Sequence, residues 1–159
     1  MRTSGNPSRT VCVAACVALA LGAVIAPGGC RKNPTPPQVT INGKGWSVEL
    51  AATPQARFVG LAGRTELPEG AGMLFIFPEP IVLQFCMRGC TIPLDVAFLH
   101  EHRRVVSTTT MADEPDRLGR VVYSSQGPAK YALEVAAGGL AAAGVKVGDE
   151  AVFAGDIPR

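Results

Sequence analysis

The chain has 159 residues with 15 basic and 13 acidic side chains, and this length suits one hydrophobic core. The small basic excess comes from Arg2 and Arg9, so that 13 residues of each sign remain once residues 1–29 are set aside. A neutral domain gives no electrostatic basis for binding nucleic acid, and we expect no such partner.

Residues 1–29 have the parts of a secretory signal peptide. A basic start precedes sixteen apolar residues at 11–26, and Pro27-Gly28-Gly29 leads to Cys30. A membrane-spanning helix needs roughly 20 apolar residues, which favours a removed signal over a retained signal anchor. The exit resembles a lipoprotein box, although Pro27 replaces its usual aliphatic residue. The resemblance implies a lipid on Cys30 and a membrane-attached, periplasm-facing protein of the cell envelope.

Residues 30–38 contain three prolines within RKNPTPPQ and predict an extended tether. At about 3.1 Å per residue, such a segment would hold the domain roughly 25 Å from the membrane. We expect a single β-rich domain over residues 39–159.

Short β-branched and aromatic runs then alternate with turn residues. Residues 39–41 and 46–50 predict two strands joined by a turn. Thr53 and Pro54 predict the start of a short helix that ends near Gly63. Further strands are expected at residues 72–77, 81–87, 94–99, 104–110, 121–123, 130–135 and 151–153, and a second short helix at 138–144. This pattern predicts an α+β domain, mostly antiparallel β, compact and barrel-like, with two short helices.

A series of motifs runs through residues 46–153. They lie at residues 53–54, 60–64, 67–68, 72–75, 85–87, 92–95, 97–98 and 147–149, together with Tyr131, Glu134 and Gly144. In this order they resemble domain of unknown function 192, a family of small, often exported proteins. The resemblance implies a compact β-barrel-like fold, and it implies no particular activity.

Apart from the lipidated Cys30, the cysteines that would remain after processing are Cys86 and Cys90. The family usually has Phe-Trp-Met-Lys-Asn-Thr where this chain has FCMRGC at residues 85–90. Paired cysteines in an oxidising compartment predict a local disulfide. Two alternatives stay open, a reversible thiol-redox pair and a copper site in which Met87 or Met73 completes the two thiolates.

Charged residues beside apolar runs suggest a polar pocket. Arg64 and Asp95 match family positions, and we expect them to line one ligand pocket with Met87 or to pair with each other. The alternative is that each satisfies a local backbone group. The further polar candidates for this region are Glu134, Tyr131 and Tyr123.

No catalytic constellation accompanies these residues. Ser124 and Ser125 lack a Gly-x-Ser-x-Gly setting, and His100 and His102 predict either a polar turn or a His-x-His metal pair. The sequence therefore favours a non-enzymatic envelope lipoprotein without a cofactor that binds a small ligand or an envelope protein. A copper or thiol-redox protein that uses Cys86 and Cys90 is the alternative.

Overall fold

The computed structural model describes residues 35–158. The predicted signal peptide, the lipidation site Cys30 and tether residues 30–34 lie outside the described residues. Between residues 35 and 158 no helix is both long enough and apolar enough to cross a membrane. The first strand begins at Gln38.

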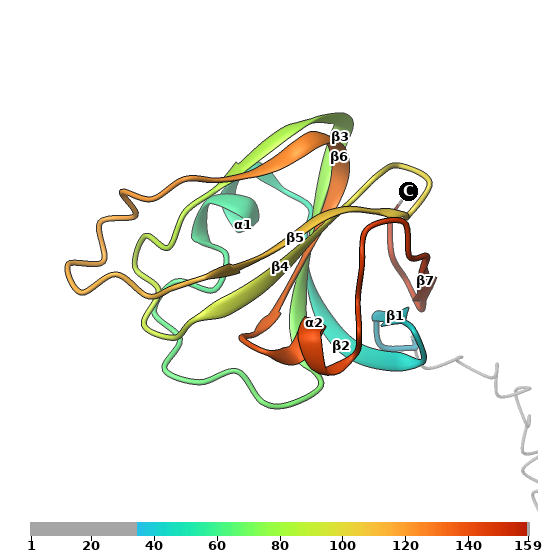
Figure 1. Cartoon of the computed structure of the whole chain (residues 1–159), viewed down its shortest axis with the longest axis horizontal. Helices are drawn as coiled ribbons and strands as arrows, with labels where there is room; N and C mark the ends of the chain where they lie inside the picture. Colours follow the sequence, from blue (N-terminus) through green and yellow to red (C-terminus); the bar gives the residue numbers. More distant parts are fainter. Residues whose placement is uncertain (1–34, 159) are drawn as a thin grey trace, which may run out of the picture. The chain divides into compact units, whose positions relative to one another are not determined.

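The described residues form one seven-stranded sheet that curls into a half-barrel (Figure 1). The strands are β1 (Gln38–Ile41), β2 (Lys44–Ala51), β3 (Ala71–Phe85), β4 (Leu94–Leu99), β5 (Val105–Met111), β6 (Tyr123–Ala136) and β7 (Ala151–Ala154). They lie in the order β5-β4-β6-β3-β2-β1-β7, and each neighbouring pair is antiparallel except the parallel pair β2–β3. The helices are α1 (Pro54–Val59) and α2 (Gly139–Ala142). The predicted fold class is confirmed.

The two edges of the sheet approach each other at one end. Arg104, just before β5, forms an antiparallel bridge with Glu150, just before β7. The backbone N–H of Val105 also donates to the carbonyl of Asp149 at 2.9 Å. These contacts hold the two edges together at one end and so give the sheet its barrel-like form. They also protect part of each edge from pairing with another chain.

The sheet has a hydrophobic core on each face. In β3 and β6 successive side chains alternate between the two cores. Leu74 and Leu133 enter the first core, whereas Phe75 and Ala132 enter the second. The second core continues toward α1, because the partly buried Ala56 packs against it.

The ends of α1 follow from local chemistry. The Thr53 hydroxyl accepts a hydrogen bond from the Ala56 N–H at 3.1 Å, and Pro54 occupies the first turn. The helix stops before Gly60, whose φ of 51° leaves helical geometry. The predicted start is therefore confirmed, while the predicted end near Gly63 lies too far along the chain.

The strand predicted at 72–77 and residues 81–85 of the strand predicted at 81–87 belong to one continuous strand, β3, and residues 86–87 follow its end. The prolines Pro78 and Pro80 do not end it, because they lie where the register with β6 shifts, between residues 76 and 81. A residue without an N–H costs no ladder hydrogen bond at such an irregularity. Similarly, Tyr123 and the strand predicted at 130–135 belong to the single long strand β6, whereas residues 121–122 of the strand predicted at 121–123 precede it.

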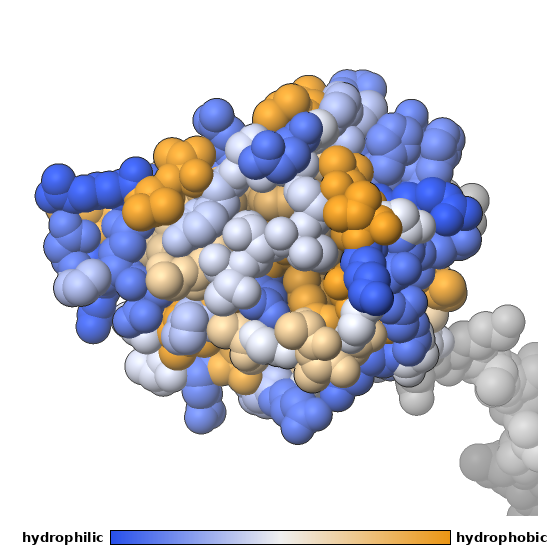
Figure 2. Space-filling model, viewed as in Figure 1, coloured by the Kyte–Doolittle hydropathy of each residue, from blue (hydrophilic) through white to orange (hydrophobic). Residues whose placement is uncertain are grey.

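The surface mixes polar and apolar residues. Figure 2 shows apolar residues as separate spots among polar ones on this face of the molecule. Single exposed apolar residues of this kind are ordinary for a folded domain.

A buried and an exposed valine, both in strands, allow a test of how much the second core contributes to the free energy of unfolding. We expect Val96→Ala in β4, where Val96 is fully buried, to lower the free energy of unfolding by about 2–3 kcal/mol. The matched change Val152→Ala in β7, where the side chain is 58% exposed, should cost less than about 0.5 kcal/mol. Urea denaturation measures both values, and equal losses would contradict this position of the second core.

Candidate functional site

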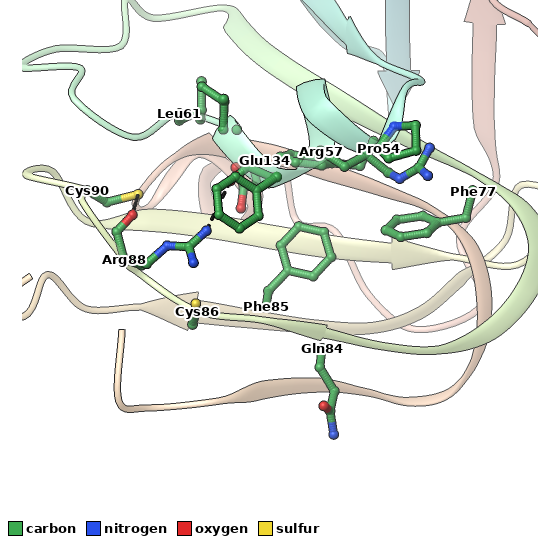
Figure 3. Close-up of a pocket in the computed structure, with 14 residues that line it drawn as sticks. Pro54, Arg57, Leu61, Phe77, Gln84, Phe85, Cys86, Arg88, Cys90 and Glu134 are labelled. Carbon is green, nitrogen blue, oxygen red and sulfur yellow. Dashed lines mark hydrogen bonds between the residues drawn. The ribbon is translucent and has the colours of Figure 1, made fainter. Parts of the chain in front are cut away.

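A cavity of about 370 Å³ lies between α1, the strand β3 and the segment that follows β3 (Figure 3). Its lining contains four phenylalanines, two arginines, two cysteines and one glutamate. The rings belong to Phe58 of α1 and to Phe75, Phe77 and Phe85 of β3. Aromatic walls with few polar groups are typical of small-molecule sites, whose volumes run from about 300 to 1,000 Å³.

The aromatic walls are held by edge-to-face contacts. The centroid of the Phe85 ring lies 4.9 Å from that of Phe75, 6.4 Å from that of Phe77 and 5.4 Å from that of Phe98. Gly60 lets the end of α1 approach closely, since a Cβ atom there would lie 3.2 Å from the Phe75 ring. The sequence thus builds a cup of interlocked rings in which Phe85 is central.

The carboxyl group of Glu134 reaches this cavity from β6. Glu134 faces the second core between its two cross-strand partners, Met73 of β3 and Val96 of β4. The residue is only 5% exposed, and within residues 35–158 no hydrogen bond to its side chain is formed. Every side-chain nitrogen or oxygen atom that is fully enclosed within residues 35–158 has a hydrogen-bond partner. Since the Glu134 oxygens have none, they are not fully enclosed and must open onto the cavity.

Burial changes the protonation of Glu134. Removal from water disfavours the charged form and raises the pKa of Glu134 from its ordinary value of 4.5 to about 8. At neutral pH the group is therefore mainly a neutral carboxylic acid, with one O–H donor for a hydrogen bond.

The two arginines of the lining stack on aromatic rings. The guanidinium of Arg57 lies 4.9 Å from the centroid of Phe77, and its Nη1 donates to the carbonyls of Ala52 and Ile76 at 2.6 and 2.8 Å. The guanidinium of Arg88 lies 4.0 Å from the centroid of Phe58. Cation–π contacts and backbone acceptors thus fix where the positive charges lie.

The predicted disulfide is absent, because Cys86 and Cys90 are both free thiols in the structure. Their surroundings differ, since Cys86 is exposed and Cys90 is buried. Figure 3 shows them on the two sides of Arg88. Burial, together with Glu134 and Cys86, raises the pKa of Cys90 to about 11. The Cys90 thiol is therefore a poor nucleophile at neutral pH.

Comparison with known proteins now identifies the family. The family model DUF192, described as Uncharacterized ACR, matches residues 37–153. The chain belongs to the DUF192 family. No curated protein shows significant similarity to it.

Two solved structures resemble this DUF192 chain. A protein of unknown function from Novosphingobium aromaticivorans DSM 12444 is 32% identical with a TM-score of 0.67, over 75% of this chain and 84% of that one. A putative transcription regulator from Sinorhizobium meliloti 1021 is 26% identical with a TM-score of 0.68, over 76% of this chain and 95% of that one. Both share the fold of the DUF192 domain.

The residues expected to form a polar pocket have separate roles in this DUF192 domain. The guanidinium of Arg64 makes a bidentate pair with Glu49, with N–O distances of 2.7 and 2.6 Å. The carboxylate of Asp95 accepts hydrogen bonds from the Thr110 hydroxyl at 2.7 Å and from the Leu140 N–H at 3.1 Å. The prediction that Arg64 pairs with Asp95 is therefore wrong.

The third predicted pocket residue, Met87, is fully buried in the second core. Neither Met87 nor Arg64 nor Asp95 lines the Glu134 cavity. Of the further polar candidates, Glu134 lines it, whereas Tyr131 lies in the first core and the Tyr123 hydroxyl accepts from the Ala112 N–H.

The histidines lie in the turn between β4 and β5. Within residues 35–158, three side chains lie close enough together to hold a metal ion, with their potential ligand atoms within 4.8 Å of one another. They are His100, Glu101 and His102. This group includes none of the copper ligands that the sequence suggests. The copper alternative at Cys86 and Cys90 stays a prediction.

The aromatic cup and the two arginines of the lining were not predicted from the sequence as parts of a site. One signal for the site was available, because Glu134 is the single charged residue in the apolar stretch 131–137. Its place between apolar neighbours marked it as a buried carboxyl, but only the fold shows that Phe58 and Arg88 lie across from it.

The raised pKa of Glu134 predicts a pH-dependent stability. Between pH 4.5 and about 8 the folded state binds a proton that the unfolded state releases, so stability falls as pH rises through this range. The variant Glu134→Gln lacks this loss. We therefore compare the melting temperature of the variant with that of the native protein at two pH values. The difference, variant minus native, should be larger at pH 8.5 than at pH 5 by on the order of 10 °C.

Thermal denaturation followed by circular dichroism at several pH values measures the effect. The exposed Glu66→Gln is the control and should melt in parallel with the native protein at every pH. Parallel profiles for Glu134→Gln as well would show that the Glu134 carboxyl is ionised in the folded state.

Proposed function

We propose that this DUF192 domain is a non-enzymatic binding domain that takes a small, partly apolar ligand into the cavity above Glu134. One observation carries the proposal. The Glu134 carboxyl is buried in an aromatic cavity without a hydrogen-bond partner among residues 35–158. Because the Glu134 oxygens open onto the cavity, a ligand there can supply the hydrogen-bond partner that the fold does not.

A ligand would complete both parts of the cavity. Its apolar body would cover the exposed faces of the rings, of which Phe58 is 64% exposed. Its polar atoms would accept the proton of the neutral Glu134 carboxyl, which restores the hydrogen bond that burial removes. Affinity would come from the apolar contact and orientation from Glu134.

Binding is favoured over catalysis by the state of the lining groups. The Cys90 thiol has a pKa near 11 and stays protonated at neutral pH, so it is not poised to act as a nucleophile. Glu134 has no hydrogen-bond partner among residues 35–158 that would orient it for proton transfer. The export and lipid anchor expected from residues 1–30 concern where binding takes place, and they stay predictions.

A neutral fluorescent probe tests the proposal. We expect N-phenyl-1-naphthylamine to bind the domain saturably at one site, with the rise in fluorescence that transfer to an apolar pocket causes. The variant Val59→Trp places an indole at the cavity, where Val59 is 49% exposed, and should weaken binding by about tenfold or more.

The matched control is Val147→Trp, which adds the same ring at a valine that is 68% exposed and outside the cavity lining. This variant should bind the probe as the native protein does. Absence of saturable binding, or equal loss in both variants, would exclude ligand binding in this cavity.

A further inference from the structure

We propose that the ligand is an organic carboxylate with an apolar body, and that its anionic group contacts Arg88. This inference rests on the proposed ligand binding and names the chemical class of the ligand. Three features support it: the positive charge of the lining, the free hydrogen-bond donors of Arg88, and the stacking of both arginines on aromatic rings that a cationic ligand would otherwise use.

The lining is positively charged at neutral pH. Its ionisable groups are Arg57, Arg88, Glu134, Cys86 and Cys90. Glu134 and Cys90 have pKa values raised to about 8 and about 11, so both are mainly neutral. The two guanidinium groups are thus not balanced by the buried acid, and the cavity favours an anion.

Arg88 has the hydrogen-bonding capacity to hold that anion. Its guanidinium makes one long hydrogen bond, 3.3 Å from Nη2 to the carbonyl of Phe58, and pairs with no carboxylate within residues 35–158. A guanidinium has five N–H donors in a planar fork that matches a carboxylate. Arg57, by contrast, already donates to two backbone carbonyls and contributes mainly its charge.

Two acids of the loop beside Arg88, Glu114 and Asp116, are engaged by other groups. The loop 112–122 approaches this residue, and the backbone of Arg117 accepts from Gly89 at 3.0 Å. On this loop, Asp116 pairs with Arg120 at 2.9 Å. Glu114 accepts backbone N–H groups of residues 120 and 121, which lowers its pKa. Neither of these two carboxylates pairs with Arg88, so the guanidinium of Arg88 stays available to an anionic ligand.

A cationic ligand fits this cavity poorly. Ammonium groups bind aromatic faces, but Arg88 already occupies one face of Phe58 and Arg57 one face of Phe77. A cation would meet two fixed positive charges, and the protonated Glu134 would not offset them. A carboxylate instead accepts hydrogen bonds both from Arg88 and from a neutral carboxyl group.

Two compounds of the same shape test the charge of the ligand. We expect 2-naphthoate to bind about tenfold more tightly than the neutral 2-naphthamide in calorimetric titrations at pH 7, because only the carboxylate forms charge-assisted hydrogen bonds. The variant Arg88→Gln should bring the two affinities to within about twofold. Arg88→Lys keeps the charge but loses the planar fork and the stacking on Phe58, so it should keep only part of the preference. Arg88 is exposed, so these changes should leave folding intact.

The control is Arg104→Gln, which removes an exposed arginine outside the cavity and should leave the preference unchanged. Binding of N-phenyl-1-naphthylamine in the same samples separates the two proposals. If this probe binds and naphthamide equals or exceeds naphthoate, the carboxylate class is wrong and ligand binding stands. If neither the probe nor naphthoate binds, both proposals fail.

Discussion

The central strand β6 is the constraint on which the site depends. It pairs with β3 on one side and β4 on the other, so its side chains from residue 131 to residue 135 must alternate between two cores. Tyr131, Leu133 and Val135 fill the first core, and Glu134 must therefore face the second. A shift of one residue would exchange every one of these positions, so the burial of Glu134 is fixed by the register of the whole sheet.

The ladder gives Glu134 no polar neighbour. Its partners across the strands are Met73 and Val96, both buried and apolar, and an isolated charge between them would be costly. Two outcomes relieve the cost: the carboxyl keeps its proton, or a ligand enters and supplies a partner. Residues from α1 and from the segment after β3 surround the same point, which links a feature of the sheet to the cavity and to the positive rim at Arg88.

Local features were predictable from the sequence, whereas the site was not. The turn at Asn42 and Gly43, with φ of 51° and 80°, and the cap at Thr53 depend on neighbours along the chain. Continuity of β3 past Pro78 depends on its pairing with β6, which sequence patterns do not reveal. The contact of Arg88 with Phe58 likewise joins residues 30 positions apart, and the expected pairing of Arg64 with Asp95 failed because Glu49 lies closer.

The most direct test of the central claim is the ionisation of Glu134 itself. Carbon-13 NMR of the side-chain carboxyl, assigned by the signal that Glu134→Gln removes, follows its titration in the ligand-free protein. The structure predicts a midpoint near pH 8, because burial without a partner raises the pKa of Glu134. A midpoint below pH 5 would mean that the carboxylate is ionised and stabilised in the fold, which would contradict an unpartnered acid at the base of the cavity.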